Sequence, residues 1–233
     1  MLNKRGLGHV EAILSFVIFI GFIVFAFVFF SPFESNRTLR STSDYAWREV
    51  YDFSRVELEI YSVFIDDLSP PLIAAVSLTG APSGWNAVVE DSMGAIVQSY
   101  TDLSGVVHYT TPSNKFARIK FGQDFSQGVN VIAGTPPQSY TVSSSENSKF
   151  MSEKKLLELN ASYYSDYSNL KKQFNLPNRV NFGFAVTFYD GTQILASREI
   201  PENTEVLSKS DRLQVVRLPS GIIEYAEVRV FVW

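Results

Sequence analysis

The stretch KRGLGHVE, at residues 4–11, stands directly before a long apolar run that extends to Phe33. From Ala12 to Phe33 the chain has 22 residues without a charge. As a helix, this run would be roughly 33 Å long, enough to cross a hydrocarbon core of about 30 Å. The sequence therefore predicts a hydrophobic helix that spans a membrane. Glu11 lies at the start of this helix. An unpaired carboxylate next to an apolar segment is energetically costly, so we expect Glu11 to have a specific role.

The charges before the apolar run predict its orientation. Lys4 and Arg5 place the N-terminus in the cytoplasm by the positive-inside rule, so that everything after Phe33 lies outside the cell. A conventional secretory signal fits poorly, because its apolar region is usually about 7–15 residues long and ends at a small-x-small cleavage site. The sequence thus predicts a chain held at the cell membrane with an extracellular C-terminal domain.

The composition excludes several classes of function. The 233 residues carry a formal net charge of -4. Lys4, Arg5 and Glu11 give residues 1–33 a charge of +1, so the remainder carries -5 and offers no basic face to a nucleic acid. Cysteine is absent, which rules out disulfides and thiolate metal sites.

The rest of the chain predicts a β-rich domain on a polar neck. Residues 34–54 are polar and predict a neck with a short helix over about 44–54. From Val56 onward, apolar and polar residues alternate, and short apolar runs separated by Gly and Pro then continue to residue 121. Residues 122–150 are rich in turn formers and predict a loop with one strand near 139–143.

One helix is predicted late in the chain, over about 152–174. Its apolar side chains recur three or four residues apart in a single stripe, which we interpret as a core face: Leu156, Leu159, Tyr163, Tyr167, Leu170 and Phe174. Pro177 prevents the helix from continuing. Two hairpins are predicted after it, one turning at Asp190-Gly191 and one ending in the strand 222–233.

No catalytic, cofactor or metal site is predicted. The sequence has no nucleophile elbow, phosphate loop or dinucleotide fingerprint. The acid pairs 66–67 and 90–91 are interpreted as solvated turn residues, and His108 as a surface or packed imidazole. Asn36 and Asn160 begin Asn-x-Ser/Thr patterns and are candidate N-glycosylation sites.

The N-terminal motif is similar to the leader of type IV prepilins, and the short basic leader resembles that of archaeal pilin-like proteins. The resemblance implies that a prepilin peptidase recognises Lys4 and Arg5 and cuts between Gly6 and Leu7. It also implies that Glu11 meets the terminal amine of a neighbouring subunit, with the apolar helices packed in the core of a filament. Gly8 and His9 depart from the residues expected between the cut and Glu11.

The expected fold is α+β, with a long N-terminal hydrophobic helix, a β-rich exported head and one packed helix. The expected domains are a leader at 1–6, a transmembrane and filament-core helix at 7–33, a neck with a short helix at 34–54, and the head at 55–233. The expected function is that of a structural subunit in a cell-surface filament, with adhesion as a candidate further role. Its partners are then other subunits, the peptidase and the membrane. The alternative is a single-pass anchored binding protein that does not polymerise, and a third class is a minor pseudopilin-like part of a secretion or uptake machine.

Overall fold

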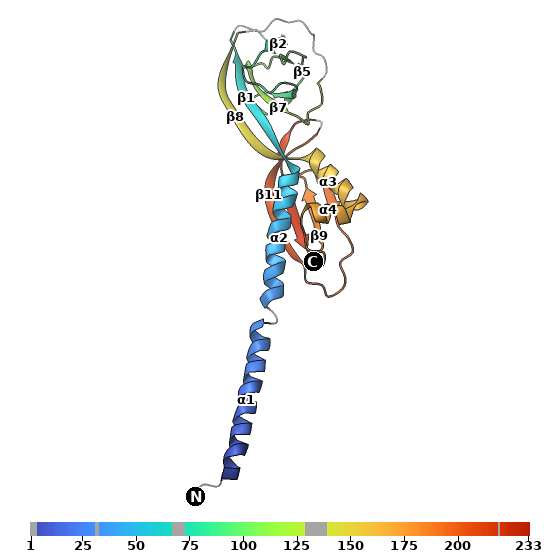
Figure 1. Cartoon of the computed structure of the whole chain (residues 1–233). Helices are drawn as coiled ribbons and strands as arrows, with labels where there is room; N and C mark the ends of the chain where they lie inside the picture. The colour runs from blue at the N-terminus through green and yellow to red at the C-terminus, as the bar shows by residue number, and fades with distance from the viewer. Residues whose placement is uncertain (1–3, 31–32, 67–72, 129–138, 219) are drawn as a thin grey trace.

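The computed structural model shows two helices in line, followed by a head of two lobes (Figure 1). It describes residues 4–30, 33–66, 73–128, 139–218 and 220–233, and it describes no side chains at 4–10, 27–30 or 33–38. The expected leader residues 1–3 and residues 31–32 of the expected 7–33 helix therefore lie outside the described residues. We call the part formed by residues 33–54 and 153–233 the proximal lobe, and the part formed by residues 55–152 the distal lobe.

The chain is α+β, but strands dominate it. The prediction of a membrane-spanning helix is wrong. Helix α1 covers Lys4–Phe30 and helix α2 covers Phe33–Ser54. In the part of the chain that the structure describes, no helix is both long and apolar enough to cross a membrane. The single-pass anchor of the alternative function depends on the same helix and is corrected with it.

Helix α2 is longer than the short helix expected in the neck. Over its C-terminal half it packs on strands β11 and β12, and it buries Ala46 and Val50 completely or nearly so. The Ser54 hydroxyl donates to the Val50 carbonyl oxygen at 2.7 Å and closes the last turn. The chain then passes directly into strand β1 at Arg55.

The proximal lobe is a four-stranded part of a larger sheet with three helices on one face. Its strands lie in the order β10-β9-β12-β11. Their bounds are Phe182–Thr187 for β9, Gln193–Ala196 for β10, Leu207–Val216 for β11 and Ile223–Val232 for β12. One face of β12 is buried as its alternation predicts, and the residues on that face are Ala226, Val228, Val230 and Val232.

The expected helix over 152–174 is two helices, α3 over Glu153–Ser165 and α4 over Tyr167–Gln173. Asp166 separates them with φ -148° and ψ 65°, and its carboxylate accepts a hydrogen bond from the Asn169 backbone N–H to cap α4. Ser152 caps α3 in the same way, through Lys155 N–H. The bend leaves the apolar stripe intact, because all its side chains from Leu156 to Phe174 are buried.

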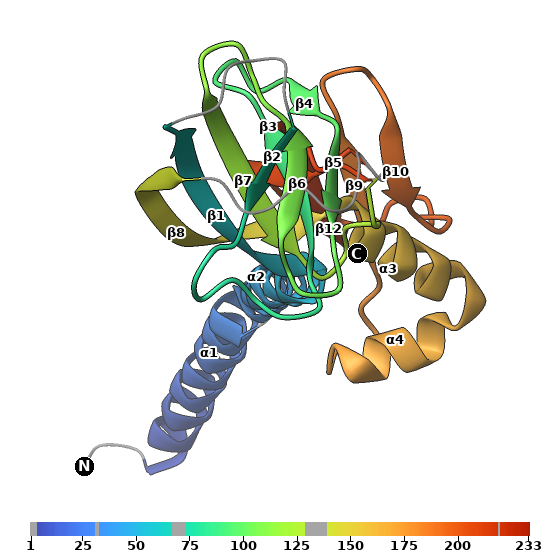
Figure 2. The same ribbon diagram turned by 90° about the horizontal axis from the view of Figure 1, so that it is seen from above.

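The distal lobe closes around a second core. The strands β8-β1-β7-β3-β4 continue the large sheet, and β2-β6-β5 form a separate small sheet. Their bounds are Arg55–Ile65 for β1, Ile73–Val76 for β2, Asn86–Glu90 for β3, Ile96–Val97 for β4, Ser99–Thr101 for β5, Val107–Thr110 for β6, Phe116–Gly122 for β7 and Tyr140–Ser152 for β8. Seen from above, the two sheets face each other (Figure 2), and Tyr109, Ile119 and Phe121 are buried between them.

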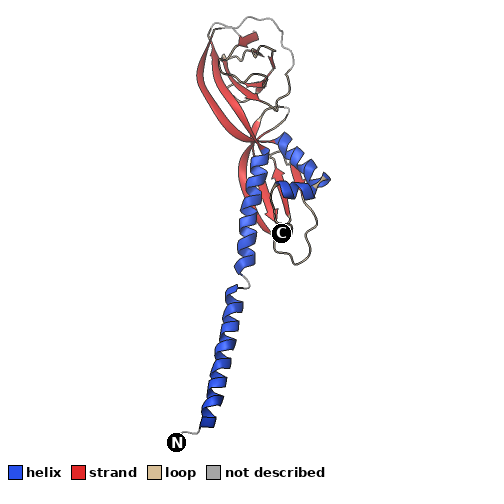
Figure 3. Ribbon diagram, in the orientation of Figure 1, coloured by secondary structure: helices blue, strands red, loops and turns tan. Residues whose placement is uncertain are grey.

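The two lobes meet at a narrow junction, which Figure 3 shows as a crossing of strands. Strand β8 pairs with β1 from Tyr140 to Met151, with an irregularity at Ser143, but it pairs with β11 only at Met151 and Ser152. Beyond these two residues the outer edge of β8 has no strand partner in the described part of the chain, and residues 141–147 are exposed. The β8 strand is thus much longer than the 139–143 segment expected from the sequence.

A buried ion pair lies where the β11–β12 turn meets the distal sheet. Lys120 on β7 pairs with Glu90 on β3, and both residues are buried. The Lys120 ammonium also lies 3.4 Å from the carbonyl oxygen of Gly221 in that turn. Gly221 has φ +72°, and a Cβ there would lie 2.9 Å from a methyl group of Val88. The position therefore needs glycine for both its conformation and its close approach.

Candidate functional site

The first candidate site is the apolar surface of α1, which extends away from the lobes (Figure 1). Its large side chains other than the half-buried Ile23 are exposed, from Ile13 at 65% to Phe25 at 53%. The consecutive residues Phe16 to Ile20 are all exposed. Because successive residues of a helix point about 100° apart, these five cover the whole circumference of the helix. The described part of α1 therefore presents an apolar surface on every side, without a face packed on the lobes.

Glu11 is the one charged residue of this surface between residues 11 and 26. Its side chain is exposed, and it makes no hydrogen bond or ion pair with another described residue. Leu7 lies four residues before Glu11 in the same helix and therefore on the same side of it. The backbone of Lys4, Arg5, Gly6 and Leu7 belongs to α1, but their side chains lie outside the described residues.

The two candidate glycosylation sites both lie in helices. Asn160 is in α3 and half-buried, and its side-chain nitrogen donates a hydrogen bond of 3.1 Å to the Leu195 carbonyl oxygen. Attachment of a sugar would replace one of the two hydrogens on that nitrogen, so the remaining N–H would have to make this bond. Asn36 is in α2, and its side chain lies outside the described residues.

The acids and the histidine considered from the sequence have structural contacts. Glu90 forms the buried pair with Lys120, so it is not the solvated turn residue expected. Asp91 does hold a turn, since its carboxylate accepts from the backbone N–H groups of Met93 and Ala95. His108 is a packed imidazole, 3% exposed, and its Nε2 lies 3.2 Å from Asp102. Within the described residues, no group of three or more His, Asp or Glu side chains could hold a metal ion.

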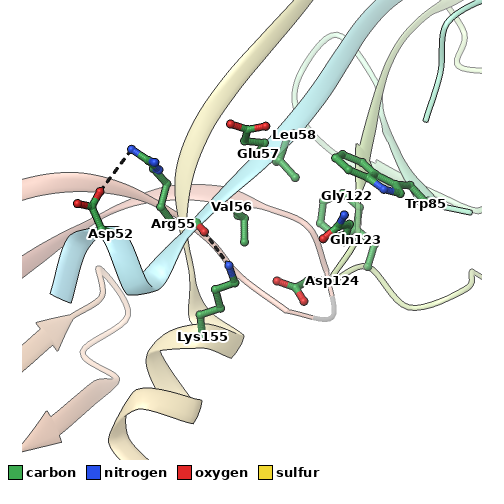
Figure 4. A pocket seen from close by; sticks show the side chains of 11 residues that line it. Asp52, Arg55, Val56, Glu57, Leu58, Trp85, Gly122, Gln123, Asp124 and Lys155 are labelled. Atoms are coloured by element: carbon green, nitrogen blue, oxygen red, sulfur yellow. Dashed lines mark hydrogen bonds and ion pairs between the residues drawn. The ribbon is translucent and has the colours of Figure 1, made fainter. Parts of the chain in front are cut away.

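The second candidate site is a cleft between the lobes, which we call the junction cleft (Figure 4). It has a volume of about 290 Å³. The proximal side is formed by the end of α2 and the first turn of α3, the floor by the start of β1, and the distal side by Trp85 and the loop after β7. The lining residues are Asp52, Arg55, Val56, Glu57, Leu58, Trp85, Gly122, Gln123, Asp124, Phe125 and Lys155.

The loop after β7 is held in a defined shape. A Cβ at Gly122 would lie 2.8 Å from Leu58 and 3.0 Å from Phe125, so glycine allows these two side chains to meet under the loop. The Asn86 amide donates a hydrogen bond of 2.8 Å to the Phe125 carbonyl oxygen. Asp124 accepts a hydrogen bond from Ser152 at 3.3 Å. The walls of the junction cleft are therefore formed in advance.

The charged groups of the junction cleft are already paired. Asp52 lies 3.4 Å from Arg55, and the Lys155 ammonium donates to the Arg55 carbonyl oxygen at 2.9 Å. Glu57 lies 3.3 Å from Lys149 at the rim. Lys154 pairs with Asp124 at 2.8 Å, and this hydrogen bond and the attraction between the charges raise the pKa of Lys154.

Two polar side chains of the cleft have no hydrogen-bond partner among the described residues. The Gln123 amide and the Trp85 indole N–H make no hydrogen bond with another described residue. Gln123 is exposed and Trp85 is half-buried. Sequence reasoning missed this site because its residues come from five segments between 52 and 155, and only the strand pairing brings them together.

Comparison with family models, with characterised proteins and with solved structures gives no match to this chain. The geometry of α1 and of the junction cleft therefore stands alone as the basis for a function.

Proposed function

We propose that this chain is a structural subunit of a type IV pilus-like filament at the cell surface. The observation that carries the proposal is the apolar surface of α1, which is exposed on every side between residues 11 and 26. Burial of one large aliphatic or aromatic side chain contributes about 1.5–3 kcal/mol. A helix that is apolar all round is buried in its functional state. In a filament, copies of the same helix supply that cover.

Glu11 fits this assembly as the partner of a terminal amine. Covering α1 would bury its carboxylate, and a buried carboxylate needs an opposite charge. In the proposed sequence of events, a prepilin peptidase recognises Lys4 and Arg5 and cuts between Gly6 and Leu7. The cut creates a new ammonium group at Leu7. That group on one subunit then pairs with Glu11 on its neighbour.

The lobes suit the outside of such a filament. The proximal sheet exposes charged residues such as Glu227 and Arg229 on the face away from its helices. In this arrangement the α1 helices form the filament core and the β-rich lobes face the medium.

The test compares Glu11→Ala with the matched control Glu202→Ala, which removes an exposed carboxylate from a loop of the proximal lobe. Both variants are expressed in the native host, and sheared surface material is examined by electron microscopy and peptide mapping. We expect Glu11→Ala to abolish filaments that contain this chain and Glu202→Ala to retain them. N-terminal sequencing should give a mature chain that begins at Leu7. Filaments that persist unchanged in Glu11→Ala would remove the assembly role, and a mature chain that begins at Met1 would remove the processing step.

A further inference from the structure

We propose that the junction cleft is a binding site for a neutral saccharide of one or two rings. The proposal does not depend on filament assembly, because it rests only on residues of the two lobes. The volume of about 290 Å³ is close to the lower limit of about 300 Å³ for small-molecule sites. The fixed loop and the packed floor of Val56, Leu58 and Phe125 mean that a ligand finds the cleft already formed.

The charge of the cleft argues against an ionic ligand. Its lining includes three carboxylates and two cationic side chains, and each of the five already has a partner within the protein. Phosphate or sulfate would meet an excess of negative charge, and a cation would have to compete with Arg55, Lys149 and Lys154 for the carboxylates. A neutral ligand avoids both costs.

The uncommitted groups of the cleft match the chemistry of a sugar. Trp85 offers an aromatic surface, and the C–H face of a pyranose ring is an apolar surface of similar size. Gln123 has donor and acceptor atoms that make no hydrogen bond with another described residue, and a hydroxyl group both donates and accepts hydrogen bonds. These two side chains lie together on the distal side of the cleft (Figure 4). A ring stacked on Trp85 would therefore present its edge hydroxyls to Gln123.

The position of the cleft adds a consequence for the lobes. Trp85 and Gln123 belong to the distal lobe, whereas Asp52 and Lys155 belong to helices of the proximal lobe. A bound ring would contact both lobes at the place where the main sheet is joined by only two residue pairs of β8 and β11.

The experiment is saturation-transfer difference NMR on the full chain, with glucose, galactose, mannose, N-acetylglucosamine and their common disaccharides as probes. We expect at least one probe to bind with a dissociation constant in the millimolar range, with transfer concentrated on the protons of one ring face. Gln123→Ala should weaken binding about fivefold and Trp85→Ala at least about tenfold. Tyr189→Ala, which removes an aromatic ring that is 90% exposed and outside the cleft, should leave binding unchanged.

Two results would overturn the proposal. One is the absence of transfer to every probe at about 50 mM, a concentration at which millimolar ligands nearly saturate their site. The other is binding that Gln123→Ala and Trp85→Ala leave unchanged. Gln123 is exposed and without a partner among the described residues, so its variant should fold even if Trp85→Ala, which removes packing from the distal core, does not.

Discussion

The buried pair of Lys120 and Glu90 gives the sharpest test of how the junction is held. Glu90→Met keeps the length of the side chain but leaves the Lys120 ammonium in a site where it is only 2% exposed. Its remaining polar neighbour is the Gly221 carbonyl oxygen at 3.4 Å, which is too distant for a strong hydrogen bond. Removal of one partner from a buried pair costs about 3–5 kcal/mol, because the other charge is left without compensation.

The double variant Glu90→Met/Lys120→Met separates that penalty from the net contribution of the ion pair to the free energy of unfolding. Two apolar side chains of similar volume leave no charge to be buried, and such replacements are neutral or stabilising by about 1–4 kcal/mol. We therefore expect each single variant to be destabilised by about 3–5 kcal/mol and the double variant to be at least as stable as the original chain.

The pH dependence of stability provides a second test of the same ion pair. Burial lowers the pKa of Lys120, and the hydrogen bond and charge of Glu90 oppose that change. Without Glu90, the pKa of Lys120 in the folded state falls further below its unfolded value of about 10.4. The unfolded state then binds more protons, so the stability of Glu90→Met should rise with pH between the two pKa values. Urea denaturation followed by circular dichroism, at about pH 7 and about pH 9.5, measures both effects. A cost below about 1 kcal/mol for Glu90→Met, or a double variant as unstable as the sum of the single ones, would refute this reasoning.

Two further predictions concern the cores of the two lobes. Leu159→Ala removes a side chain that is 0% exposed and should lower the free energy of unfolding, measured by urea denaturation, by about 3 kcal/mol. Leu157 on the same helix is 51% exposed, so Leu157→Ala should lower it by less than about 1 kcal/mol. Equal losses in the two variants would contradict the packing of α3. Burial raises the pKa of Asp102, but hydrogen bonds from Ser104, His108 and Val106 outweigh this and hold it at about 2. Because this value lies below the unfolded value of about 3.9, the carboxylate stabilises the fold above about pH 4 and loses that contribution as the pH falls to about 2. The urea midpoint of Asp102→Asn should therefore fall less steeply than that of the original chain over this pH window. Equal pH dependence of the two midpoints would exclude the effect.

Elements with one buried face were predictable from the sequence. The stripe from Leu156 to Phe174 and the alternation in 222–233 both reflect contact with the proximal core, and the structure confirms both. The division of α3 from α4 was missed, because Asp166 does not interrupt the apolar spacing and its capping role depends on the local backbone.

The polar halves of two strands were not predictable in the same way. Residues 141–147 of β8 and most residues of β11 before Val215 are exposed, because little of the described chain covers the faces of these strands away from the junction. Without a buried face there is no alternation to detect, and the serine-rich segment of β8 reads as a loop. The junction cleft was hidden for a related reason, because Trp85, Gln123 and Lys155 share no local pattern.

Helix α2 enters strand β1 without a loop, since the helix ends at Ser54 and the strand begins at Arg55. A pulling force applied along α2 would therefore load β1 along its own axis. Strand β1 is held on both sides by antiparallel partners, β7 and β8, whose hydrogen bonds lie across the direction of pulling. Bonds in that arrangement are sheared together, so tension would pass into the distal sheet without peeling its strands apart in turn. The short β8–β11 contact lies beside this line of force, so the tension would reach the distal sheet through β1 and not through that contact.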